Sequence, residues 1–205
     1  MSSREAVLGK VRQAIAGAAA PEVARTYDRS LDLSRQALLD LFVERVDDYR
    51  ADVRRVSRSE LAHTVGAVLA QHGATRVVVP DDLDRQWLTT VTVPVLPDAP
   101  TVSARELDSV SAVVTASAVG IALTGTIVLD AGPGQGRRMI SLIPDLHVCV
   151  VLADQVVGTV PEALPRLDAT RPLTWISGPS ATSDIELDRV EGVHGPRTLV
   201  VLLVE

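Results

Sequence analysis

Short runs of aliphatic residues, each bounded by polar or glycine-containing segments, constrain the fold of this chain more than any other feature of its sequence. The runs are Thr75–Pro80, Ser111–Ser117, Gly120–Leu129, His147–Leu152, Leu173–Ser177 and Thr198–Val204. Their lengths and their Val, Leu and Ile content are typical of strands buried on both faces. Helix-compatible segments such as Asp81–Leu88 and Arg105–Ser109 separate several of them. The sequence therefore predicts an α/β fold, a three-layer sandwich with a mostly parallel sheet covered on both faces.

Helical patterns dominate the residues that precede these runs. Apolar residues recur at helical spacing in three segments, 7–15, 38–49 and 61–69. Ser30 or Asp32 is the expected N-cap of the second helix, and Ser57 with Glu60 forms a capping-box pattern before the third. A further excursion is expected at Arg138–Leu142, as a short strand antiparallel to the run before it.

The composition limits the class of protein and its partners. The 205 residues fit one α/β domain, residues 51–205, with an N-terminal helical region, residues 1–50. Aromatic residues make up only 2% and the net charge is −6, which argues against a nucleic-acid surface. The first residues are polar and no run approaches the roughly 20 apolar residues of a membrane helix. We therefore expect a cytoplasmic protein with no nucleic-acid or membrane partner.

The residue types that cofactors and metals need are scarce. Cys149 is the only cysteine, so the chain cannot alone hold an iron–sulfur cluster or a cysteine–zinc site. Lys10 is the only lysine and Val11 follows it, so no phosphate-binding P-loop exists. The glycine spacing does not match a dinucleotide fingerprint, and the histidines lack metal-binding spacing. No cofactor and no metal are expected in this chain.

The first of two polar, glycine-containing stretches is Thr124–Arg138. Its glycines permit positive φ angles and a close approach of backbone amides to a ligand, and its arginines suit charge-assisted binding of an anion. The residues expected to contact an anion here are Thr124, Gly125, Thr126, Gly134, Gly136 and Arg137. A glycine-rich hairpin that only joins two strands explains the same residues equally well.

The second stretch runs from Ile176 to Glu186 and is followed by Gly192–Arg197. A strand is expected to lead through a turn into a short helix, whose first amides would form an anion site. The anion-binding candidates are Gly178, Ser180, Thr182 and His194. Alternatively, the hydroxyls only cap the helix.

A serine hydrolase triad is a weaker interpretation of the same stretch. Ser180, Asp184 and His194 stand in hydrolase order, but Thr182 replaces the last glycine of a nucleophile elbow. The other histidines are expected to pack or to lie at the surface, and His147 is expected only to precede a buried strand. Among the four histidines, His194 alone is a functional candidate.

Four motifs in this order resemble the LUD-domain family, and within it the lactate utilization protein C (LutC/YkgG) type. They are TGTIVL, GQGRR with LIPDLHVCVV, SGPSATSDIE and GVHGPR, which together fall within residues 55–205. The third and fourth motifs as a pair are the specific part of the resemblance. Ser183 departs from the alanine expected in the commoner form.

This resemblance implies a fold, a role and partners. The fold would be similar to that of the NagB/RpiA/CoA-transferase-like group, whose members include ribose-phosphate isomerases, glucosamine-phosphate deaminases and CoA-transferases. The role would be that of a non-redox component of L-lactate oxidation to pyruvate, beside iron–sulfur proteins. The alternative is an isomerase-like or CoA-transferase-like enzyme acting on a small anionic metabolite, with Asp184, Glu186 or His194 as the catalytic acid or base.

Both glycine-containing stretches follow expected strands, which predicts one shared site. Ligands of open α/β sheets bind beyond the carboxyl ends of the strands. The Gly132–Arg138 loop and the Ser177–Ser183 turn are therefore expected to converge on one pocket for a small carboxylate or phosphate. Arg137→Ala should then weaken anion binding with little change in melting temperature, unless a register shift of one residue gives that role to Arg138.

Overall fold

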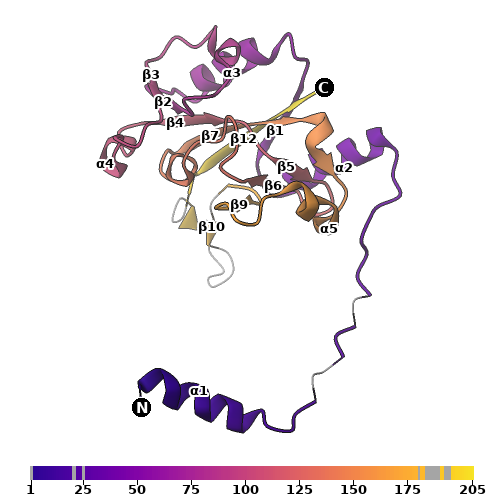
Figure 1. The fold of residues 1–205 in the computed structure, drawn as a ribbon. Coiled ribbons are helices and arrows are strands. Elements are labelled where there is room, and N and C mark those ends of the chain that lie inside the picture. Colours follow the sequence, from indigo (N-terminus) through magenta and orange to yellow (C-terminus); the bar gives the residue numbers. More distant parts are fainter. Residues whose placement is uncertain (1, 20–21, 25, 180, 183–189, 192–194) are drawn as a thin grey trace.

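A six-stranded, wholly parallel sheet forms the centre of the protein (Figure 1). The computed structural model describes residues 2–19, 22–24, 26–179, 181–182, 190–191 and 195–205. In spatial order the strands are β1 (Asp52–Val56), β12 (Thr198–Val204), β7 (Leu146–Leu152), β4 (Ala112–Thr115), β2 (Val77–Val79) and β3 (Val95–Pro97). Almost every residue of β2, β4, β7 and β12 is buried, as expected for strands covered on both faces.

One face of this sheet is covered by α3 (Leu61–Gln71) and by the 3-10 helix η1 (Arg85–Leu88). The apolar side of α3 packs on alternate residues of the strands, such as Val114 of β4 and Val150 of β7. Gly73 adopts a φ of +63° directly after α3 and ends it, because glycine tolerates the left-handed conformation.

The opposite face is covered by α2 (Arg35–Asp48), by α4 (Ala104–Leu107) and by a second, four-stranded sheet. The strands of this second sheet are, in spatial order, β8 (Val156–Val157), β5 (Val119–Ile121), β6 (Thr126–Leu129) and β9 (Thr174–Ile176). Its β6 runs antiparallel to both β5 and β9. The predicted α/β class, with a mostly parallel sheet covered on both faces, is confirmed.

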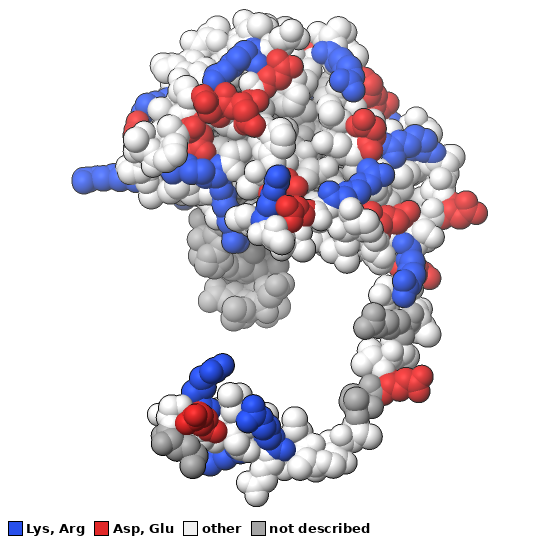
Figure 2. Space-filling model, in the orientation of Figure 1, with Lys and Arg blue, Asp and Glu red and all other residues white. Residues whose placement is uncertain are grey.

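The remaining elements are short and join these layers. They are η2 (Arg138–Ser141), η3 (Ala153–Gln155), α5 (Val160–Ala163), η4 (Leu164–Arg166), β10 (Ala181–Thr182) and β11 (Val190–Glu191). The last two pair antiparallel as a separate two-stranded sheet. On the face shown in Figure 2, acidic and basic side chains are interspersed. No helix in the described ranges is both long and apolar enough to cross a membrane.

The first helix, α1 (Ser3–Ala14), lies apart from the layers (Figure 1). A complete capping box of Ser2 and Glu5 begins it, so its start is encoded locally. None of its residues is buried.

Several local predictions were wrong. The apolar run Gly120–Leu129 contains two strands, β5 and β6, because Gly125 at φ +57° turns the chain between them. Arg138–Leu142 forms a 3-10 turn instead of a strand. The N-cap of α2 is Ser34, whose hydroxyl accepts from the Ala37 amide. The strands β1 and β3 were not predicted, since charged residues interrupt the first and prolines flank the second.

Candidate functional site

A pocket lies where the starts of β7 and β12 face β9 of the second sheet. Its volume is about 250 Å³. The lining residues are Ser141, Leu142, His147, Thr174, Trp175, Ile176, Ser177, Gly178, Pro179, Gly195, Pro196 and Leu199. Seven of these twelve residues come from three of the four motifs: LIPDLHVCVV supplies Leu142 and His147, SGPSATSDIE supplies Ser177–Pro179, and GVHGPR supplies Gly195 and Pro196. We call this cavity the inter-sheet pocket.

His147 is the titratable residue of the pocket's described lining. It is the second residue of β7 and only 1% exposed. Its Nε2 lies 2.8 Å from the hydroxyl of Thr115 on the neighbouring β4. That hydroxyl also donates to the sulfur of Cys149, 3.8 Å away. Burial lowers the pKa of His147 to about 4, so the ring is neutral at pH 7.

Cys149 belongs to the same buried polar row, two residues along β7. Burial raises the pKa of its thiol to about 12, outweighing the opposite effect of the Thr115 hydrogen bond. A thiol that stays protonated is a poor nucleophile and a poor metal ligand. The buried position of Cys149 therefore favours neither nucleophilic attack nor metal binding by its thiol.

The TGTIVL motif reaches the pocket through hydroxyl groups. The Thr126 hydroxyl lies 2.8 Å from that of Thr124 and 2.8 Å from that of Ser177. The structure therefore brings Thr124, Thr126 and Ser177 together. This follows from the antiparallel pairing of β6 and β9, which places the start of β6 beside the end of β9.

The two glycines beside these hydroxyls have a packing role. Gly125 has a φ of +57°, and a Cβ there would lie 2.5 Å from the carbonyl oxygen of Arg45. Gly178 has a φ of +81°, and its Cβ would lie 2.6 Å from the Cβ of Tyr49. Both glycines let α2 approach the second sheet closely, which explains them without a ligand. Their predicted contact with an anion stays a prediction.

The Gly132–Arg138 loop is held together by its own side chains. The Asp130 carboxylate accepts from the Gly132 amide at 3.0 Å and from the Gln135 side chain at 2.9 Å. The Gln135 side-chain oxygen in turn accepts from the Asp130 amide. The Gly134 carbonyl accepts from the Ala116 amide, which fixes the loop beyond the carboxyl end of β4. Several polar groups of this loop thus have partners inside the protein.

Arg137 forms an ion pair and also lines a cavity outside the inter-sheet pocket. Its guanidinium donates to one Asp98 oxygen from Nε at 2.9 Å and from an Nη at 2.6 Å, and its amide donates to the other oxygen at 3.0 Å. Asp98 is buried directly after β3. Gly136 packs against the same carboxylate, since a Cβ there would lie 3.3 Å from it. Arg137 and Gly136 therefore have a structural role in the described geometry.

Arg138 is exposed and lines a second cavity of about 530 Å³, together with Asp81, Asp82 and Asp98. Because three aspartates and two arginines line this cavity of about 530 Å³, it suits a small anion less well than the inter-sheet pocket.

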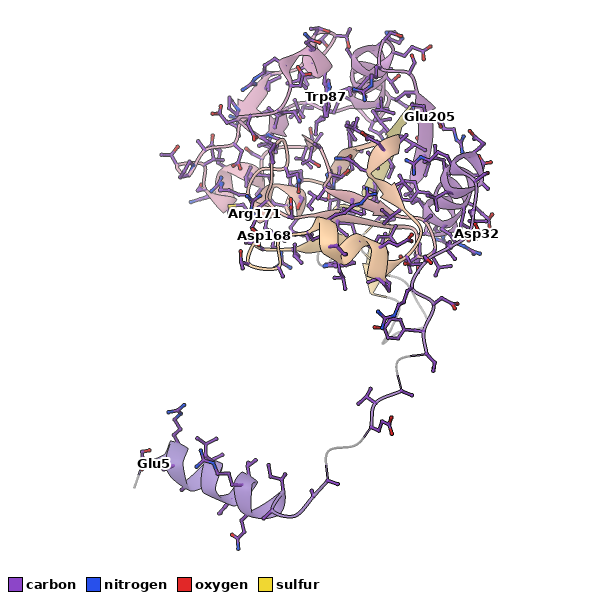
Figure 3. The ribbon with its side chains drawn as sticks, turned by 45° about the vertical axis from the view of Figure 1, so that its right-hand side comes forward. Glu5, Asp32, Trp87, Asp168, Arg171 and Glu205 are labelled. Atoms are coloured by element: carbon purple, nitrogen blue, oxygen red, sulfur yellow. The ribbon has the colours of Figure 1, made fainter. Side chains whose placement is uncertain are left out.

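A further ion pair lies in the segment before β9. Figure 3 shows Arg171 and Asp168 close together there, and Arg171 Nε lies 3.4 Å from the Asp168 carboxylate.

The prediction that the Gly132–Arg138 loop and the Ser177–Ser183 turn share one pocket at the carboxyl edge of the sheet is wrong for the described residues. Gly132–Arg138 lies beyond the ends of β2 and β4, whereas Ser177–Pro179 lies near the start of β7. The reason is that β6 and β9 are antiparallel, so the segments that follow them leave at opposite ends. Among the described residues, Ser141 and Thr174 line both the inter-sheet pocket and a narrow cavity beside Arg138.

Four candidates from the second stretch, Ser180, Asp184, Glu186 and His194, lie outside the described residues. Thr182 belongs to the strand β10, so the expected helix does not begin there. Within the part of the chain that the structure describes, no group of three or more His, Cys, Asp and Glu side chains is placed to hold a metal.

His147 is the functional candidate that sequence reasoning missed. An ionisable residue inside the otherwise apolar run LHVCVVL, on a strand buried on both faces, is costly unless it has a polar partner. An ionisable histidine within an apolar strand pattern was therefore the sequence feature that could have identified His147 as a candidate. Ser141, Thr174 and Trp175 carried no such feature, because single hydroxyls and tryptophans are common in packing positions.

Comparison with known proteins agrees with the motifs that meet in the pocket. The chain is 48% identical to the lactate utilization protein C of Deinococcus radiodurans over 202 residues, which cover 97% of this chain and 93% of that one. It is 25% identical to the lactate utilization protein C of Shouchella clausii, covering 85% and 82%. The crystal structure of a DUF162 family protein from Deinococcus radiodurans matches with a TM-score of 0.73 and 45% identity, covering 84% of this chain and 99% of that one. The family model of the LUD domain matches residues 39–204. This chain belongs to the LUD domain family.

Proposed function

We propose that this protein is a non-redox component of L-lactate utilisation, the oxidation of L-lactate to pyruvate, and acts with iron–sulfur partner proteins in the cytoplasm. Similarity to proteins named lactate utilization protein C supports the role in lactate utilisation. The single cysteine supports the division of labour, since it is buried and protonated and this chain cannot supply a cluster's ligands. We also propose that the chain itself binds no redox cofactor.

The inter-sheet pocket is the proposed binding site for a small carboxylate. The observation that carries this proposal is the convergence of three family motifs on one cavity, with the TGTIVL motif joined to it by the Thr126–Ser177 hydrogen bond. The described lining holds hydroxyl groups of Ser141, Thr174 and Ser177, one histidine and no carboxylate. Such a lining does not repel an anion, and Trp175 offers an apolar side.

An isomerase-like or CoA-transferase-like activity is less well supported by the described geometry. Its acid and base candidates, Asp184, Glu186 and His194, lie outside the described residues. The described part of the pocket offers groups that bind and orient a ligand, which favours the binding role.

Growth of a deletion strain tests the role in the cell. Deleting the gene should impair growth on L-lactate but not on glucose, and the wild-type gene should restore it. Ser177→Phe should not restore it, because the aromatic ring would fill the pocket from an exposed position. Ala169→Phe is the matched control, at an exposed position before β9 that does not line the pocket.

The purified proteins test the division of labour. This chain alone should not reduce a dye with L-lactate, and activity should appear only when the iron–sulfur partners are added. Undiminished growth of the deletion strain on L-lactate would contradict the cellular role. Dye reduction by this chain alone would contradict the non-redox assignment.

A further inference from the structure

We propose that His147 recognises the hydroxyl group of a small 2-hydroxycarboxylate in the inter-sheet pocket, by accepting its hydrogen bond at Nδ1. The pocket would thereby prefer 2-hydroxy acids to 2-oxo acids and to acids without the oxygen. This inference rests on the proposed function, because it assigns a substrate class to the same pocket.

The ring of His147 is fixed in place by the central sheet. In the parallel register His147 stands beside Val113 on one side and Leu199 on the other. Its Nε2 is held 2.8 Å from the Thr115 hydroxyl. Within the described residues only Nε2 of this ring has a hydrogen-bond partner, and because His147 lines the pocket we assign Nδ1 to an occupant. A ring held on both sides can orient a ligand at little entropic cost.

The inference assigns the ring proton of His147 to Nε2, on the basis of the two contacts of the Thr115 hydroxyl. The Thr115 hydroxyl has one hydrogen, which it donates to the Cys149 sulfur. As part of this inference we assign the proton to Nε2, so that Nε2–H donates to the Thr115 oxygen. A neutral imidazole with its proton on Nε2 has a lone pair on Nδ1, so Nδ1 is an acceptor. The titratable group that faces this chain is the Cys149 thiol, which stays protonated, and burial keeps the ring itself neutral.

An acceptor at this position distinguishes three related acids. The hydroxyl of L-lactate can donate to Nδ1. The keto oxygen of pyruvate is itself an acceptor and would leave Nδ1 unpaired, which has a desolvation cost. Propionate has no oxygen at that carbon. At about 250 Å³ the pocket has room for all three molecules, since one water occupies about 30 Å³ of liquid. Size therefore does not discriminate between them, and the hydrogen bond does.

Calorimetry with the full chain at pH 7 tests the preference, using L-lactate, pyruvate and propionate as probes. A hydrogen bond that contributes about 0.5–1.5 kcal/mol predicts that L-lactate binds about two- to tenfold more tightly than propionate. Pyruvate should bind no more tightly than propionate.

The matched variants are His147→Leu and His147→Asn. The two side chains have nearly the same shape, and both lose the contact with Thr115, so they share any packing defect. Only asparagine keeps an acceptor where Nδ1 stood. His147→Leu should bind L-lactate and propionate equally, and His147→Asn should retain most of the preference.

Nitrogen-15 NMR of the wild-type imidazoles gives a test that needs no variant to fold. One histidine should show the Nε2-protonated neutral form from pH 5.5 to 8, and L-lactate should shift its Nδ1 signal more than propionate does. A ring protonated on Nδ1, or equal affinities for the three acids in the wild type, would overturn this inference while leaving the pocket intact. If none of the acids binds, the proposed binding site fails and the inference fails with it.

Discussion

The ion pair between Arg137 and Asp98 gives a prediction whose size follows from burial. The Asp98 side chain is 4% exposed and that of Arg137 is 33% exposed. Arg137→Ala would leave a buried carboxylate with one backbone hydrogen bond, from the amide of residue 137. Breaking a buried ion pair in this way costs about 3–5 kcal/mol, and water reaching the half-buried arginine position lowers this to about 2–4 kcal/mol.

The expected fall in melting temperature is therefore about 4–16 °C, because 1 kcal/mol corresponds to about 2–4 °C in a protein of this size. The sequence alone predicted the opposite, a variant with weaker anion binding and little change in melting temperature. Urea titration and calorimetry would measure the change in unfolding free energy directly.

Arg138→Ala is the control for this experiment. Arg138 is adjacent and exposed, and it forms no ion pair with a described side chain, so its removal should change stability by less than about 0.5 kcal/mol. Adding Asp98→Asn to Arg137→Ala removes the unpaired charge, and the double variant should be less destabilised than the sum of the single ones. Equal stabilities of Arg137→Ala and Arg138→Ala, within about 0.5 kcal/mol, would refute the reasoning.

Three further predictions follow from buried groups and tight turns. The pKa of His147 falls from 6.5 to about 4 on folding, so between these pH values the unfolded chain binds a proton that the folded chain does not. The free energy of unfolding should therefore fall by about 3 kcal/mol as the pH is lowered from 6.5 to 4. Urea titrations should show a weaker dependence of this free energy on pH for His147→Leu than for the wild type. The Cys149 thiol should resist iodoacetamide at pH 8 in the native protein and react only in denaturant, as followed by mass spectrometry. Gly125→Ala should lower the free energy of unfolding by about 2–4 kcal/mol in thermal unfolding, because the new Cβ would clash with the Arg45 backbone. Gly73→Ala is the control: Gly73 has a similar φ but lies in open space, so this variant should lose only about 1–2 kcal/mol of unfolding free energy.

The sequence predicted the central sheet well because burial on both faces leaves a clear pattern. Runs such as His147–Leu152 and Thr198–Val204 correspond almost residue for residue to β7 and β12. The pattern of continuous apolar residues is absent from strands that carry charged side chains or are short and lie at the edge of the sheet. Thus β1 contains Arg54 and Arg55, and β3 consists of only three residues at the edge of the sheet.

The candidate site was predicted less well, because strand direction decides which loops meet. The sequence showed that Arg137 and Ser177 each follow a strand closely, but not that β6 and β9 belong to a second sheet and run in opposite directions. The partner of Arg137, Asp98, lies 39 residues away and has no local signal. His147 was hidden for the opposite reason, since the strong strand pattern around it suggested packing alone.

The position of β12 between β1 and β7 has a consequence for how the chain folds. Asp52 pairs with Val200, so this contact closes a loop of 200 − 52 = 148 residues. During synthesis β1 has no neighbour in the main sheet until Thr198–Val204 has left the ribosome, because β12 is the strand with which it pairs. The edges of β1 and β7 that β12 will cover stay open for most of translation, and exposed strand edges invite pairing with other chains. Long-range parallel pairing of this kind also slows folding. The edge strand β1 is thus joined to the rest of the main sheet by a step that only β12 can complete.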